Sequence, residues 1–357
     1  MGNLQLDVAV SKDGRVVLAQ RVDDTARITW IDPWSDWPPA PIAVPEMVAG
    51  ADARLATGLE KGVSILFAPS NGYSQIKIDG LPGQLGAAAN LDLFFPQALV
   101  PAQATYGASL VGQVDFRYHF VGLGADGSKL WQVGPIGCGS IANQQRSTHP
   151  ALWAIDADRF LALFGEDPTN ADCSPDTESQ STLLMAVVGP GVPLEPVLVE
   201  DVPGAGLSTL TILPVTGSTE LRVVYGRFEN PIMSKFFHFR VTPEGNILGP
   251  PEPLDLGESV SWPPGITKVP GGFVVAFTRL PFENPETGGR LFTYLFDESA
   301  SLVAQTEVAL GAPIPPSGVR AVTSPDGRSV LLIWIQQDLM NDGFGRPRML
   351  RLDCAAE

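Results

Sequence analysis

One short hairpin phrase recurs along the chain and constrains the fold more than any other feature. Near each end, two apolar segments flank an Asp-Gly pair, Asp13-Gly14 and Asp326-Gly327. Asp-Gly between apolar runs is typical of a β-hairpin, because both positions tolerate positive φ. Weaker copies of the turn lie between them, giving markers at positions 14, 62, 107, 158, 217, 271 and 327. The markers are 45 to 59 residues apart, which suits a unit of four short strands.

Further apolar segments supply the remaining strands of each unit. Third strands are expected at 26–31, 116–121, 235–241 and 291–296, and fourth strands at 129–133 and 303–308. Seven units of four antiparallel strands predict an all-β, seven-bladed β-propeller as a single domain over 1–357, with six or eight blades as alternatives. The last unit has only three strands before Cys354. Either the last blade is three-stranded or the assignment is shifted by one strand.

The segment Ser324-Pro325-Asp326-Gly327-Arg328 resembles the Ser-Pro-Asp-Gly element of TolB-type and WD-repeat-like propellers. Only the first and last units carry it well, so the resemblance covers less than a tenth of the chain. It implies a propeller fold. It implies no particular activity, because this superfamily contains enzymes, scaffolds and binding proteins.

Composition excludes several classes of function. With 44% hydrophobic and 17% charged residues, the chain is not of the disordered class. A net charge of −16 argues against binding to nucleic acid or to an anionic membrane surface. No stretch approaches the roughly 20 apolar residues of a membrane span, so membrane insertion is not expected. We expect a monomer that binds a protein or carbohydrate ligand.

A related acidic phrase ends the second strand of three units. It places Glu166 and Asp167, Glu229, and Glu283 beside Phe and Pro. These carboxylates predict an acidic loop face for a cation, a basic partner or a sugar. The alternative is repeated turn chemistry, since Asn-Pro and Asp-Pro start turns. The phrase lacks the spacing of a Ca²⁺ loop, so no cofactor and no metal site is predicted, and Ca²⁺ stays an open alternative.

Histidine gives a single candidate for catalysis. His149 lies in a connection between blades and is the best candidate for a general base, with Glu166, Glu229 and Glu283 as candidate catalytic carboxylates. No motif of a Ser or Cys nucleophile accompanies it. Carboxylates from distant blades could still form a pair of the glycosidase kind. His119 and His238 occupy matching places in third strands and are expected to be packed side chains.

Two tryptophans stand beside prolines in one predicted loop, Trp34 and Trp37. Aromatic rings in such a loop can stack on a sugar or on a peptide proline, so both are candidate ligand-binding residues. The alternative is that they cover the edge of the first blade.

The three cysteines of the chain give information about the cellular compartment in which the protein folds. Cys138 and Cys173 fall in loops expected at one face, and we predict a disulfide between them, because exposed free thiols are a liability. The alternative is two unrelated surface thiols. A disulfide indicates an oxidising compartment, hence a secreted or periplasmic protein whose leader is absent from this chain. Cys354 is left without a predicted partner.

The sequence therefore favours an extracytoplasmic recognition or interaction module that binds through its loop face. A hydrolase or lyase acting on a glycan or another small polar substrate at the channel mouth is the alternative. A structural scaffold is a third hypothesis.

Overall fold

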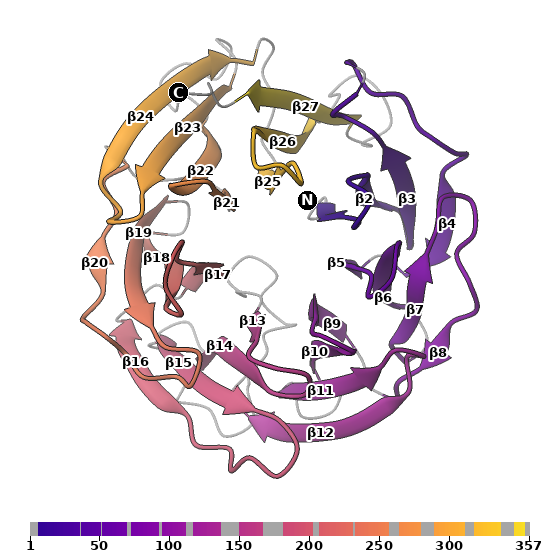
Figure 1. The fold of residues 1–357 in the computed structure, drawn as a ribbon, viewed down its shortest axis with the longest axis horizontal. Helices are drawn as coiled ribbons and strands as arrows, with labels where there is room; N and C mark the ends of the chain where they lie inside the picture. Colours follow the sequence, from indigo (N-terminus) through magenta and orange to yellow (C-terminus); the bar gives the residue numbers. More distant parts are fainter. Residues whose placement is uncertain are drawn as a thin grey trace.

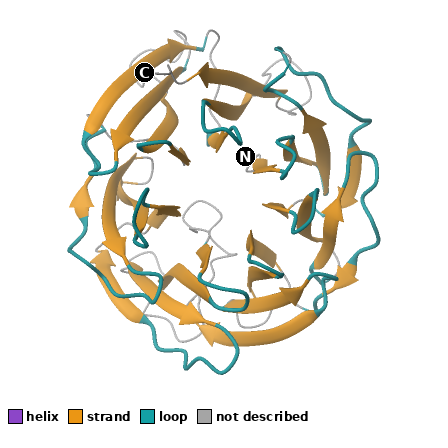
Figure 2. Ribbon diagram, viewed as in Figure 1, coloured by secondary structure: helices purple, strands orange, loops and turns teal. Residues whose placement is uncertain are grey.

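Seven antiparallel sheets surround a common centre, and the first strand of each sheet lies innermost (Figure 1). The computed structural model describes residues 6–35, 37–50, 52–69, 73–92, 95–111, 117–136, 150–166, 181–202, 207–230, 233–256, 264–279, 289–310, 318–336 and 346–353. These residues form strands and loops only (Figure 2). We number the sheets as blades 1 to 7 in chain order.

The strands of the first four blades are β1 (Leu6–Val10), β2 (Val16–Val22), β3 (Thr25–Ile31) and β4 (Glu46–Ala49); β5 (Asp52–Thr57), β6 (Val63–Ala68), β7 (Gln75–Gly80) and β8 (Ala89–Asn90); β9 (Phe95–Pro101), β10 (Thr105–Val111), β11 (Tyr118–Gly124) and β12 (Lys129–Ile136); β13 (Ala151–Ala154), β14 (Phe160–Glu166), β15 (Ser181–Val188) and β16 (Val197–Val202). Those of the last three blades are β17 (Leu207–Pro214), β18 (Leu221–Asn230), β19 (Met233–Val241) and β20 (Glu252–Pro253); β21 (Gly265–Val269), β22 (Gly272–Arg279), β23 (Arg290–Asp297) and β24 (Leu302–Ala309); β25 (Arg320–Thr323), β26 (Ser329–Gln336) and β27 (Arg346–Asp353).

The prediction of a seven-bladed, all-β propeller is confirmed. Six sheets have four strands in the order of the chain, and the seventh sheet, β25-β26-β27, has three in the part that the structure describes. Of the two explanations that the sequence left open for the last unit, the described residues fit the three-stranded blade, since β1 pairs with β2 in blade 1.

The repeated Ser-x-Asp-Gly phrase forms the turn between the first two strands of a blade. In blade 7 the Ser324 hydroxyl donates to Asp326 Oδ1 (2.6 Å) and accepts from the Ser329 amide (2.9 Å). Gly327 and its counterpart Gly14 have φ of 72° and 89°, a region that glycine enters without a steric penalty. The turn therefore selects serine, aspartate and glycine for separate physical reasons.

The turn predicted at Gly107 is wrong. Gly107 lies inside β10, and the turn before it falls at 102–104. A Cβ atom at this glycine would stand 2.7 Å from the ring of Phe160 in the next blade. Glycine is needed here because the aromatic ring of the neighbouring blade packs against the backbone.

The second strand of each blade is largely apolar because both of its faces are covered by neighbouring blades. In β26, Val330, Leu332 and Trp334 pack towards blade 6, whereas Leu331, Ile333 and Ile335 pack towards blade 1. Successive side chains of a strand alternate between its faces, so one strand supplies two cores. The seven buried apolar clusters fill the seven interfaces between blades.

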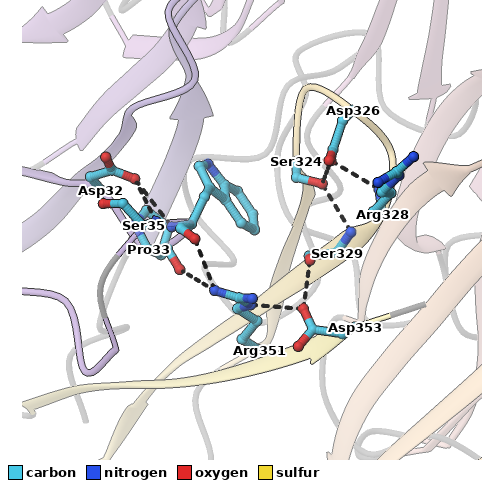
Figure 3. Close-up of polar contacts among 10 residues, drawn as sticks. Asp32, Pro33, Ser35, Ser324, Asp326, Arg328, Ser329, Arg351 and Asp353 are labelled. Atoms are coloured by element: carbon cyan, nitrogen blue, oxygen red, sulfur yellow. Dashed lines mark hydrogen bonds and ion pairs between the residues drawn. The ribbon is translucent and has the colours of Figure 1, made fainter. Parts of the chain in front are cut away.

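Blades 7 and 1 close the ring through packed side chains and a polar clamp on β27 (Figure 3). Arg351 donates to the carbonyls of Pro33 (3.2 Å) and Trp34 (3.1 Å) in blade 1. Its Nε also donates to Asp353 Oδ1 (2.8 Å), which in turn accepts from the Ser329 hydroxyl (2.6 Å). We call this group the blade 7–1 junction.

Candidate functional site

A cavity of about 380 Å³ lies at the outer side of blade 5 and contacts the β23–β24 turn of blade 6. It opens among the ends of β18 and β19, the loop after β19 and the start of β20. Three basic side chains line it, Arg222, His238 and Arg240, together with Glu220, Glu252, and apolar side chains of the β19–β20 loop. We call it the blade 5 pocket.

Arg222 is the most buried charged group of the blade 5 pocket. It stands in β18, a second strand covered on both faces, and is only 2% exposed. Its guanidinium donates to His238 Nδ1 (2.9 Å) and to the carbonyl of Glu298, and lies 5.3 Å from the centroid of the Phe273 ring. Among the described residues, no carboxylate is within ion-pair distance of it. Burial, and then the charge of Arg240, lower the pKa of Arg222.

The contact with Arg222 fixes the state of His238. A guanidinium can only donate, so Nδ1 of His238 must be the acceptor and the neutral ring carries its proton on Nε2. Burial, with the positive charge of Arg222, lowers the pKa of His238 to about 4. Glu252 Oε2 lies 3.9 Å from Nε2, which is too long for a hydrogen bond. At neutral pH, His238 therefore presents an N–H group to the pocket and has no lone pair free to act as a base.

Of the other charged groups near the blade 5 pocket, Arg240, Glu220 and Glu298 are engaged with partners. Arg240 pairs with Glu220 (3.2 Å) and donates to the carbonyl of Glu298 (3.0 Å). The carboxylate of Glu298 forms an ion pair with Lys268 and accepts from the Thr216 amide (3.3 Å). The Glu298 carboxylate is thus held by blade 6 and by the turn before β18, so only its backbone carbonyl serves the two arginines.

A second charged group lies at the centre of the ring. Asp7 of β1 accepts from the amide of Leu55 (2.8 Å) and lies 3.9 Å from the guanidinium of Arg320 in β25. Arg54 of β5 is buried and donates to the carbonyl of Gln97 (2.9 Å). Burial lowers the pKa of Arg320, and the charge of Asp7 opposes this shift. These contacts tie the inner strands of four blades together.

The two tryptophans of the predicted ligand loop differ in environment. Trp34 packs against the apolar core between blades 7 and 1, and its Nε1 donates to the carbonyl of Gly14 (2.6 Å). Trp37 is 48% exposed. Both lie in the β3–β4 loop, as expected from the sequence.

The remaining predicted site residues lie outside what the structure describes. Glu166 is the last residue of β14, and Glu229 is the penultimate residue of β18, so both lie at the end of a second strand as the acidic phrase predicted, but only their backbone is described. Asp167, Glu283, His149, Cys138 and Cys173 fall outside the described residues. The acidic face, the general base and the disulfide stay predictions.

The described residues show neither a metal centre nor a membrane-spanning helix. They contain no group of three or more His, Cys, Asp or Glu side chains arranged to hold a metal ion. Nor do they contain a helix of the length and apolarity that a membrane span requires.

Sequence reasoning missed Arg222, although a signal was present. In Leu221-Arg222-Val223-Val224-Tyr225, one arginine interrupts an apolar second strand that neighbouring blades cover on both sides. Burying an unpaired cation costs free energy, so an arginine at such a position marks a site with its own polar surroundings. The hydrogen-bond partners of Arg222 come from β19 and from the next blade, and no local sequence pattern reveals them.

Comparison with known proteins supports the fold alone. No protein-family model matches the chain, and no curated protein matches it. Among solved structures, it is similar to a protein from Bacteroides uniformis provisionally assigned as a 6-phosphogluconolactonase, with 12% identity, a TM-score of 0.54, and coverage of 96% of this chain and 97% of that one.

Two other solved structures share the fold at similarly low sequence identity. The subtype N10 neuraminidase-like protein of A/little yellow-shouldered bat/Guatemala/060/2010 is 8% identical, with a TM-score of 0.50 over 84% of this chain and 93% of that one. The tricorn protease is 10% identical, with a TM-score of 0.53 over 99% of this chain, which spans 36% of the protease. Identities this low carry no activity over to this chain.

Proposed function

We propose that this propeller is an extracytoplasmic recognition module that binds a protein or glycan partner through loops of blades 1 and 2. The observation that carries the proposal is a group of large apolar side chains exposed on the β3–β4 loop, on β4 and on the loop after β7. We call it the blade 1–2 surface. Its members are Trp37, Ile42, Val44, Met47 and Leu81.

The two loops lie side by side. The amide of Leu85, in the loop after β7, is 3.3 Å from Glu46 Oε2 at the start of β4, and it donates to this carboxylate. A Cβ atom on Gly83 would stand 3.8 Å from that of Ala43. Val44 is 85% exposed. Isolated exposed apolar side chains need no explanation, but several on neighbouring segments are typical of an interaction surface.

Trp37 gives the blade 1–2 surface its recognition chemistry. A half-exposed indole offers a flat apolar face and one N–H donor, which suits a sugar ring or a peptide proline. Trp34, whose indole N–H is bound to Gly14, anchors the same loop to the core between blades 7 and 1. The loop is therefore fixed at one tryptophan and presents the other.

The test is calorimetric titration of the protein with a panel of oligosaccharides and of basic, proline-containing peptides. At least one class should bind, and Trp37→Ala or Val44→Ser should weaken that binding about tenfold. Leu130→Ser on β12 is the matched control, because Leu130 is also an exposed apolar residue but lies on blade 3. Binding that survives Trp37→Ala unchanged, or no binding across the panel, would contradict the proposal.

The extracytoplasmic part of the proposal is supported by the cysteine argument. A disulfide between Cys138 and Cys173 would appear as a peptide pair in non-reducing mass spectrometry. Finding both as free thiols in protein made in an oxidising compartment would remove this support.

A further inference from the structure

We propose that the blade 5 pocket binds a small carboxylic acid that carries an ammonium or hydroxyl group beside its carboxylate, as in an α-amino or α-hydroxy acid. This site lies on a different blade from the blade 1–2 surface and does not depend on it. The inference rests on the donors, the acceptors and the apolar wall of the cavity.

The donors are positioned for a carboxylate. Arg222 brings a buried positive charge to the pocket without a carboxylate in contact with it among the described residues. The Nε2–H of His238 has no described acceptor within hydrogen-bond distance, and Arg240 is exposed enough to reach a ligand. Arg222 contacts the Nδ1 side of the ring and supplies positive charge to the pocket at longer range. The Nε2–H of His238 and the exposed guanidinium of Arg240, two residues apart on β19, can each donate to a carboxylate oxygen.

The acceptor is positioned for the second group of the ligand. Glu252 lies 3.9 Å from His238 Nε2, and its side chain is 69% exposed. An oxygen bound at the Nε2–H would hold the rest of the ligand close to this carboxylate. An ammonium or hydroxyl group on the carbon next to the ligand carboxylate could then donate to Glu252. A plain carboxylate would instead meet the negative charge of Glu252 with nothing to offset it.

The remaining wall limits the size and polarity of the ligand. Leu248 and Pro250 supply apolar surface from the β19–β20 loop, and Phe239 lies beneath them in the core. A volume of about 380 Å³ is at the low end for a ligand pocket. An acid with a small aliphatic side chain fits both the volume and the wall.

The experiment compares three acids that share a three-carbon skeleton: L-alanine, L-lactate and propionate. Each is titrated at millimolar concentration into the protein and followed by calorimetry and ligand-observed NMR. Alanine and lactate should bind, and propionate should bind about tenfold more weakly. Arg222→Met should weaken alanine and lactate about tenfold or more, because the buried charge is lost.

Two surface variants keep the proposal falsifiable if Arg222→Met fails to fold. Glu252→Gln should reduce the preference for alanine over propionate, and Arg240→Met should weaken all three acids. His119→Gln on β11 is the matched control, since His119 is 8% exposed like His238 but its Nδ1 contacts Gln132. No binding of any acid, binding unaffected by Arg222→Met and Arg240→Met, or propionate binding as well as alanine would overturn the proposal. Trp37→Ala should leave these affinities unchanged, which separates this test from that of the blade 1–2 surface.

Discussion

The blade 7–1 junction and the blade 5 pocket are each built around one arginine, and the two arginines are used differently. Arg351 donates to two carbonyls of blade 1 and to the carboxylate of Asp353. Arg222 is more deeply buried, yet it contacts a neutral histidine and one carbonyl. The junction satisfies its charge within the fold, whereas the pocket leaves part of its charge for a ligand.

This difference shows how a propeller separates stability from recognition. The ring must close wherever its last blade meets its first, so the junction combines an apolar core with a polar clamp. Blade 5 is already held by cores on both of its sides. Arg222 also joins blade 5 to blade 6 through the Glu298 carbonyl, but desolvating its charge costs free energy that offsets this bond.

The largest effect is expected at the junction. Trp34→Ala should lower the free energy of unfolding by about 3 kcal/mol, because it removes a packed indole and its hydrogen bond to Gly14. Trp37→Ala in the same loop should change it by less than about 0.5 kcal/mol, since that side chain is exposed. Urea unfolding measures both. Equal losses in the two variants would show that Trp34 does not anchor the ring.

The next effect concerns the pH dependence of the blade 5 pocket. His238 faces Arg222 on β18, Arg240 on its own strand and Glu252 on β20, and its pKa in the folded state is about 4 against 6.5 for an ordinary histidine. Below pH 6.5 the unfolded chain takes up a proton that the folded state refuses until about pH 4. Stability is therefore complete above pH 6.5 and is lost as the pH falls through this window.

From pH 7 to pH 5 the loss should be about 2 kcal/mol. His238→Gln should remove this part of the pH dependence, which urea unfolding at a series of pH values would reveal. A variant with the same slope as the wild type would mean that His238 is not held neutral by Arg222.

The fold was largely predictable from the sequence, for reasons visible in particular residues. The Asp-Gly turns and the apolar second strands are local signals, because a turn needs certain φ angles and a doubly covered strand needs apolar side chains. The assignment failed at Gly107, where the glycine serves the packing of Phe160 from the next blade. That contact joins residues that the local pattern does not relate.

The candidate sites were less predictable. Trp34 and Trp37 were identified together because they share one loop, but their different environments depend on Gly14 and on blade 7. Arg222 was missed because its surroundings come from β19 and from the backbone of Glu298 in another blade. Charge clusters formed between blades depend on tertiary packing, which spacing along the chain does not encode.

The comparison of the two arginines is tested most directly by the matched variants Arg351→Met and Arg222→Met, unfolded in urea at pH 7. In both variants, methionine keeps much of the volume of the arginine side chain and removes its charge. We predict that Arg351→Met loses about 1.5 kcal/mol of stability with its bonds to blade 1. Arg222→Met should lose less than Arg351→Met, because removing a desolvated charge offsets the lost bonds to His238 and Glu298. A loss in Arg222→Met as large as that in Arg351→Met would contradict the account, because Arg222 would then be a structural clamp.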